Sequence, residues 1–112
     1  SGEPYREFLY VDDLADACVF LMDKYDYKDI GELVNIGTEE EIRIKDLAAL
    51  IKEIVGFEGK IVHDLSKPDG MPRKLSDISR IKGLGWKPKT TLKEGIKKSY
   101  EWYLTSGKDI RS

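Results

Sequence analysis

Hydrophobic residues recur at helical spacing in the first part of the chain, directly after the short aromatic and apolar run Glu7–Val11. That run predicts a strand or an extended entry, and the spacing after it predicts a helix through Lys24. Either Asp12 or Asp13 is suited to cap the start of this helix. Its apolar face carries Leu14, Ala17, Cys18, Leu21 and Met22. Because Cys18 belongs to that face, we expect it to pack in the core.

Three further helices are predicted. The second ends before Gly56, a residue suited to a helix C-terminus. Its apolar residues recur at helical spacing and are Leu47, Leu50, Ile51, Ile54 and Val55. A short helix capped by Asp77 is expected to end near Gly83. The last helix begins at Thr91 with the Thr-x-x-Glu spacing of a capping box, and Gly107 can close it. Its apolar face carries Leu92, Ile96, Tyr100 and Tyr103.

Short strands are predicted at Glu32–Ile36 and Lys60–His63, and the acidic run Glu39–Glu41 predicts a solvated turn. The segment Asp64–Leu75 contains two prolines and a glycine, which predict an irregular loop. Trp86 lies in a Gly-Trp-Lys-Pro corner and is expected to plug the edge of the core. The pattern therefore predicts an α/β chain with about four helices and short strands.

Composition narrows the class of protein. The 112 residues are enough for one domain, residues 1–112, with a modest core, since 40% of them are hydrophobic. A net charge of −2 gives no general attraction to nucleic acid. No run approaches the ~18 apolar residues of a membrane span. Cys18 is the only cysteine, which favours a reducing compartment, so we expect a cytoplasmic protein without a membrane partner.

Several catalytic patterns are missing from the sequence. The glycines never form the G-x-G-x-x-G fingerprint of a dinucleotide-binding loop, and no tyrosine is followed by lysine four residues later. His63 is the only histidine and has no recognisable partner for nucleophilic catalysis. A noncatalytic binding or interaction module therefore remains open as an interpretation.

Cationic residues stand near the first strand and around the irregular loop. Arginine offers a planar fork for two phosphate oxygens and lysine adds a mobile charge, so these residue types suit a pyrophosphate. The candidates are Arg6, Lys60, Lys67, Arg73 and Lys74. The alternative is that each is an ordinary solvated surface charge. The Lys-Pro-Asp-Gly sequence around Asp69 is more informative, because proline and glycine fix the backbone on both sides of it.

Two motifs carry a resemblance to a known family. The run from Arg6 to Ala17, Arg-Glu-Phe-Leu-Tyr-Val-Asp-Asp-Leu-Ala-Asp-Ala, resembles the entry to the substrate domain in extended short-chain dehydrogenase/reductases. The run Ser66–Asp77, followed by Leu-Gly-Trp and Leu-Lys-Glu-Gly-Ile, is similar to the GDP-L-fucose synthase family in particular. Met71 replaces the threonine usual in that loop, and the stretch Thr38–Glu41 is more acidic than the family pattern.

The resemblance implies an enzyme that epimerises GDP-4-keto-6-deoxy-D-mannose at two carbons and reduces it to GDP-L-fucose with NADPH. The family's catalytic residues and NADPH loop lie upstream of the position matching Ser1, so none carries over to this sequence. We therefore expect the C-terminal substrate-binding part of a larger enzyme, working with an N-terminal nucleotide-binding domain. We do not expect this part alone to bind NADPH. Apolar surface left exposed in an isolated part would favour a homodimer.

The same resemblance assigns roles to the candidate residues. It implies that Arg6 and Lys67 contact the pyrophosphate of GDP, and that Arg73 and Lys74 contact phosphate or ribose. Lys60 is a further candidate cation, and Asp69 either shapes the loop or meets a sugar hydroxyl. Within the same class, the alternative is an epimerase or dehydratase for another nucleotide-linked sugar; from a different class, the alternative is the noncatalytic module.

Overall fold

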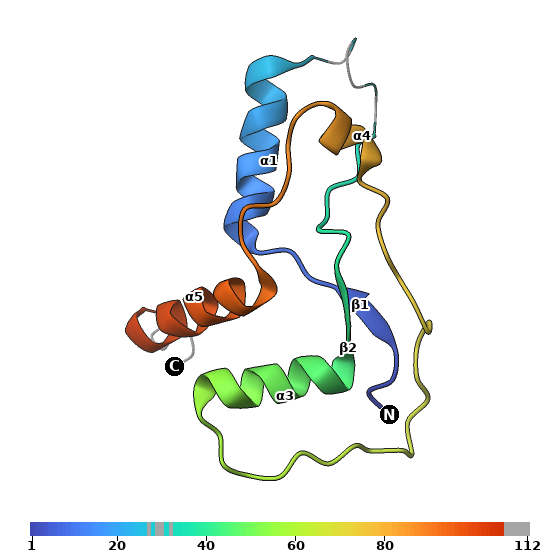
Figure 1. Cartoon of the computed structure of the whole chain (residues 1–112), viewed down its shortest axis with the longest axis vertical. Coiled ribbons are helices and arrows are strands. Elements are labelled where there is room, and N and C mark those ends of the chain that lie inside the picture. The colour runs from blue at the N-terminus through green and yellow to red at the C-terminus, as the bar shows by residue number, and fades with distance from the viewer. Residues whose placement is uncertain (27, 29–30, 32, 107–112) are drawn as a thin grey trace.

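The computed structural model describes residues 1–26, 28, 31 and 33–106, and contains helices with one small sheet, as Figure 1 shows. In chain order its elements are β1 (Tyr5–Glu7), α1 (Val11–Lys24), β2 (Glu41–Arg43), α3 (Ile44–Val55), α4 (Ser79–Gly83) and α5 (Leu92–Thr105). The two strands pair antiparallel, with Tyr5 opposite Arg43 and Glu7 opposite Glu41. The predicted class of helices with short strands is therefore confirmed.

The C-terminal end of α3 and the start of α5 lie where the sequence predicts. Helix α3 ends at Val55, and the residue after it, Gly56, has a left-handed φ of 73°, a conformation that glycine adopts without strain. Helix α5 starts with the predicted capping box, in which the Thr91 side chain accepts from the Glu94 backbone N–H and the Glu94 side chain accepts from the Thr91 backbone N–H. The expected closure at Gly107 lies outside the described residues.

The buried core lies where α1, α4 and the segment before α5 meet. Its most buried hydrophobic residues are Ala17, Ile78, Ile81 and Trp86, packed against Leu9, Phe20, Leu21, Val34 and Ile36. Trp86 is only 3% exposed, and its indole Nε1 donates a hydrogen bond of 2.9 Å to Asp16 Oδ2. The predicted role of Trp86 as a core anchor is therefore confirmed, and Asp16 provides the partner that a buried indole N–H needs.

The inward face of α1 differs from the predicted one. Cys18 is exposed, so the expectation that it packs in the core is wrong. Asp13 is instead buried at 5% exposure, because its carboxylate accepts hydrogen bonds from the backbone N–H groups of Lys89 and Thr90, at 3.1 and 2.9 Å. Neither aspartate caps the helix, since the N-cap residue is Tyr10. Hydrogen bonding from the segment before α5 therefore decides which side of α1 faces inward.

The strand predictions were less accurate than those for the helices. Glu32 lies outside the described residues, and the remainder of the predicted strand, 33–36, has no strand assignment; Lys60–His63 is likewise irregular. The expected acidic turn instead provides Glu41, the first residue of β2, while β1 ends at Glu7. A strand needs a hydrogen-bonded partner, and only β1 and β2 pair in the described part of the chain.

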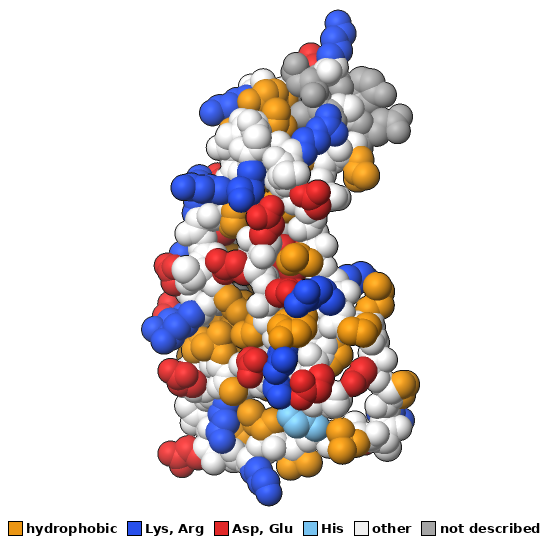
Figure 2. All heavy atoms as spheres, turned by 45° about the vertical axis from the view of Figure 1, so that its right-hand side comes forward, with side chains coloured by type: hydrophobic (Ala, Val, Ile, Leu, Met, Phe, Trp, Pro, Cys, Tyr) orange, Lys and Arg blue, Asp and Glu red, His pale blue; other side chains and the backbone are white. Residues whose placement is uncertain are grey.

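Much apolar surface remains open to solvent. Figure 2 shows hydrophobic side chains in broad areas of one face, between acidic and basic ones. Among the large hydrophobic residues exposed by more than half are Val11, Val19, Met22, Leu33, Phe57, Val62, Leu65, Met71 and Trp102. None of the helices in the described ranges is both long and apolar enough to cross a membrane.

Candidate functional site

The irregular loop that carries most of the candidate cations is attached to β1. In Figure 1 the yellow segment passes along the outer side of β1. The backbone N–H of Tyr5 donates to the carbonyl of Pro72 at 2.8 Å, and Arg6 Nη1 donates to the carbonyl of Met71 at 2.7 Å. At the end of the loop, the backbone N–H of Ser76 donates to Glu7 Oε1 at 3.2 Å. The three residues of β1 therefore hold the loop between Met71 and Ser76.

Arg6 connects the start of the chain with the proline-bracketed loop. Its Nη1 also donates to its neighbour's carbonyl, that of Tyr5, at 2.6 Å. The guanidinium has five N–H donors, and those on Nη2 and Nε have no partner among the residues that the structure describes. A Cβ at Gly70 would stand 3.2 Å from Nη2, so the missing side chain leaves room for the arginine head. The geometry leaves donors available for a ligand beside the loop.

A hollow of about 490 Å³ opens next to Arg6, between the N-terminal segment and the loop. It is lined by Glu3, Pro4, Tyr5, Arg43, Asp69, Gly70, Pro72 and Arg73. The guanidinium carbons of Arg43 and Arg73 each lie 5.0 Å from the centre of the Tyr5 ring, which is cation–π distance. Two of the candidate residues, Asp69 and Arg73, thus share one hollow, and Arg6 adjoins it through Gly70.

Arg73 and Asp69 both have partners within the protein. Arg73 forms an ion pair with Glu41 at 2.8 Å, in addition to its contact with Tyr5. Asp69 accepts a hydrogen bond from the side-chain hydroxyl of Ser1 at 2.6 Å. The positive charge of Arg73 is therefore already balanced by the carboxylate of Glu41.

The three candidate lysines are all exposed, and none has an ion-pair partner within the described ranges. Lys67 and Lys74 belong to the loop that is attached to β1. Lys60 follows α3, and no hydrogen bond or ion pair in the described ranges joins it to Arg6. The structure therefore associates Arg6 with Lys67 and Lys74 through one loop, while Lys60 belongs to a different segment.

Sequence reasoning missed Glu7, which lies between the cations and the rest of the fold. Its Oε2 accepts from the backbone N–H groups of Thr38 and Glu39, at 2.8 and 2.7 Å. Burial raises the pKa of Glu7, but the backbone N–H groups of Glu39 and Thr38, together with the side chain and backbone N–H of Ser76, outweigh it, so the pKa lies below its ordinary value. The one sequence feature that reflects this contact is the glycine at position 37. Any side chain there would collide with the Glu7 carboxylate, because a Cβ would stand 2.6 Å from Oε2.

The described residues offer little for catalysis or metal binding. His63 lies on the surface, where it is the pale blue side chain in Figure 2. No group of three or more His, Cys, Asp or Glu side chains within the described ranges could hold a metal ion. The feature of this site that suits a ligand is the set of guanidinium donors of Arg6 that have no partner among the described residues.

Comparison with known proteins shows which proteins this chain resembles. Residues 1–37 match the model of the NAD dependent epimerase/dehydratase family. The chain is 61% identical over 104 residues to putative GDP-L-fucose synthase 2 of Arabidopsis thaliana, an alignment that spans 93% of this chain and 31% of that protein. The chain is a relative of the GDP-L-fucose synthases. It spans about a third of the length of the curated relatives that it matches.

Solved structures of GDP-sugar enzymes share its fold. A GDP-L-fucose synthetase from Naegleria fowleri bound to NADP has a TM-score of 0.88 at 30% identity, over 100% of this chain and 35% of that one. The GDP-mannoheptose C4 reductase MlghC from Campylobacter jejuni with NADP bound has a TM-score of 0.83 at 45% identity, over 94% of this chain and 33% of that one. This relative of the synthases therefore has the fold of the matching third of such enzymes, as the resemblance predicted.

Proposed function

We propose that this chain is the substrate-binding part of an enzyme that converts GDP-4-keto-6-deoxy-D-mannose to GDP-L-fucose. The observation that supports this most is the attachment of Arg6 to the loop of Lys67 and Lys74. This attachment brings guanidinium donors of β1 to a loop with two ammonium groups, none of which has a partner among the described residues. A pyrophosphate needs two or three such cations converging on it.

In the proposed reaction, the nucleotide half of the substrate does not react. Its binding energy orients the sugar, so that contacts made far from the reacting carbons contribute to the rate. Arg6 would bind oxygens of the diphosphate with its Nη2 and Nε donors, which have no partner in the described ranges, and Lys67 would add a second charge to the same group. Two ring carbons beside the ketone are epimerised before the ketone is reduced.

The reductant that we propose for the complete enzyme is NADPH, which supplies a hydride when bound. This sequence contains neither the glycine fingerprint nor the Tyr-x-x-x-Lys pair that such a cofactor site uses. We therefore propose that an N-terminal nucleotide-binding domain holds it, and that residues 1–112 form the substrate-binding domain. We further propose a cytoplasmic homodimer. The exposed apolar side chains support the dimer, and the single cysteine supports a reducing compartment.

The remaining candidate residues have distinct proposed roles. Lys74 follows Arg73 in the loop and would contact phosphate or ribose. Arg73 would do so only if the substrate competed with its 2.8 Å ion pair to Glu41. Asp69 lines the hollow and would accept from a sugar hydroxyl. Lys60 has the least support, because no hydrogen bond or ion pair joins it to Arg6 among the described residues.

The first prediction concerns the two principal phosphate contacts. In the full-length protein, Arg6→Ala and Lys67→Ala are each expected to raise the dissociation constant for GDP about tenfold or more, since each removes a charge-assisted hydrogen bond. Isothermal titration calorimetry with GDP measures this. Lys87→Ala is the matched control, because Lys87 is also exposed and unpaired within the described ranges. NADPH affinity is expected to stay unchanged, and GDP affinity unchanged in both variants would overturn the site.

A further inference from the structure

The carboxylate of Glu7 joins three segments that are far apart in the sequence. Oε2 accepts from Thr38 and Glu39, and Oε1 accepts from Ser76, which is 69 residues away along the chain. Three of the donors are backbone N–H groups, so Glu7 fixes the path of the chain at those points. The side chain of Ser76 also forms a hydrogen bond to the Glu7 carboxylate. No lysine or arginine pairs with Glu7 in the described part of the chain.

The position of Glu7 couples these bonds to the candidate site. Its neighbour Arg6 donates to the carbonyl of Met71, while Glu7 accepts from Ser76 at the other end of the same short stretch. Lys74 lies between these two attachment points. Losing the Ser76 bond would release one end of the stretch, and the position of Lys74 relative to Arg6 would then be less well defined.

We propose that Glu7 is a positioning residue that sets the placement of Lys74 relative to Arg6 through its bond to Ser76. This proposal rests on the proposed function, because it specifies how the same site is held in shape. Glu7 touches no substrate in it: both carboxylate oxygens already accept backbone N–H groups. Its contribution is to hold the loop ready, so that binding GDP does not have to order it.

Glu7→Gln tests this in the full-length protein. A glutamine oxygen can keep the two bonds to Thr38 and Glu39, but its NH₂ group then faces the N–H of Ser76, and donor meets donor. The opposite amide orientation restores the Ser76 bond and loses the other two. We expect the dissociation constant for GDP to rise about threefold to tenfold, the range for one lost hydrogen bond. KM for the GDP-sugar should rise with it, while kcat at saturation and NADPH affinity stay unchanged.

Gly37→Ala tests the same carboxylate without changing any charge. A Cβ at Gly37 would stand 2.6 and 2.8 Å from the two oxygens of Glu7, so the carboxylate must move. We expect the same rise in the GDP dissociation constant as for Glu7→Gln, and faster hydrogen exchange at the Ser76 amide in both variants. Glu40→Gln is the matched control, because it removes one nearby exposed charge and should leave GDP affinity unchanged.

The outcomes separate the two proposals. Unchanged GDP affinity in both Glu7→Gln and Gly37→Ala, with Arg6→Ala still defective, would overturn the positioning role and leave the proposed function in place. A lowered melting temperature with unchanged GDP affinity of the folded protein would also overturn it, since a purely structural role predicts that result. If Arg6→Ala and Lys67→Ala bind GDP normally, the proposed function fails and this inference fails with it.

Discussion

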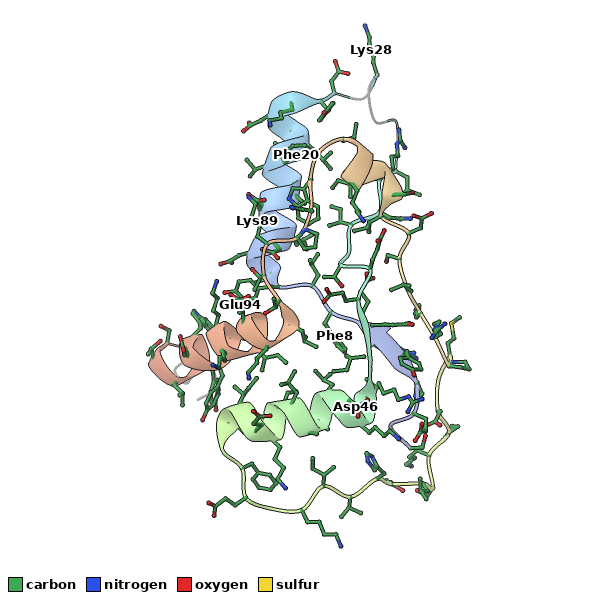
Figure 3. The ribbon with its side chains drawn as sticks, viewed as in Figure 1. Phe8, Phe20, Lys28, Asp46, Lys89 and Glu94 are labelled. Atoms are coloured by element: carbon green, nitrogen blue, oxygen red, sulfur yellow. The ribbon has the colours of Figure 1, made fainter. Side chains whose placement is uncertain are left out.

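At the scale of single residues, buried carboxylates decide how distant segments meet. Asp13 accepts three hydrogen bonds from Lys89 and Thr90, including one from the Thr90 hydroxyl at 2.9 Å. Lys89 lies beside α1 in Figure 3, just ahead of Glu94 and the first turn of α5. A carboxylate at 5% exposure is stable only with such partners, so the aspartate fixes where α5 starts relative to α1.

Asp13→Ala is therefore expected to lower the free energy of unfolding by about 2–4 kcal/mol, because it leaves two backbone N–H groups without an acceptor. Urea denaturation of the full-length protein measures the change. Asp12→Ala, at an exposed position one residue earlier, serves as control and should cost far less. Equal losses in the two variants would contradict the assigned role of Asp13.

The lowered pKa of Glu7 predicts a pH dependence of stability. The folded pKa lies below the ordinary value of 4.5, so the unfolded state binds the proton more readily. The stabilisation by the carboxylate is therefore complete above pH 4.5 and is lost as the pH falls through the lower folded value. Unfolding free energies of the wild type and Glu7→Gln should differ at pH 7 and converge under acid. A difference independent of pH would contradict this assignment.

At the scale of elements, α5 shows how a local signal fixes a helix start. Its capping box gives the first turn two hydrogen bonds, and the helix packs against α3. The carboxyl pKa of Glu94 is lowered by its bonds to the side chain and backbone of Thr91. Gly95 is buried, and a Cβ there would come 3.3 Å from the Cβ of Tyr10, so glycine permits α5 to lie close to the start of α1.

Thr91→Ala is expected to destabilise the protein by about 1 kcal/mol, the usual cost of removing an N-cap side chain. Thr91→Ser keeps the hydroxyl and should retain most of the stability. Thermal unfolding of both variants beside the wild type makes the comparison. A serine variant as unstable as the alanine variant would show that the methyl group, and not the cap, stabilises the helix.

At the scale of the whole molecule, the chain has a small core and an extended form. Its principal-axis extents are 51 × 35 × 24 Å, and the buried hydrophobic cluster lies at the α1 and α4 end. The candidate site lies away from that cluster, at the sheet and its loop (Figure 1). The position of the loop therefore depends more on hydrogen bonds to β1 than on burial. Substitutions at Glu7 and Arg6 are expected to displace it for that reason.

The sequence by itself determined the features whose causes are local. The C-terminal end of α3 follows from Gly56, and the start of α5 follows from the capping box. The irregular loop follows from its prolines and glycine. The motif resemblance also associated Arg6 with Lys67 before any geometry was known. The helix signals and the irregular loop depend on residue types within a few positions of one another, where side-chain and backbone chemistry act directly, whereas the association of Arg6 with Lys67 comes from the resemblance alone.

Only the tertiary structure decided which residues become partners across long separations. The pairing of β1 with β2, the inward turn of Asp13 and the three bonds to Glu7 join residues that are 31 to 77 positions apart or belong to separate strands. A carboxylate in the sequence looks the same whether water or a backbone N–H solvates it. Which of the two occurs depends on what the fold brings within hydrogen-bonding distance.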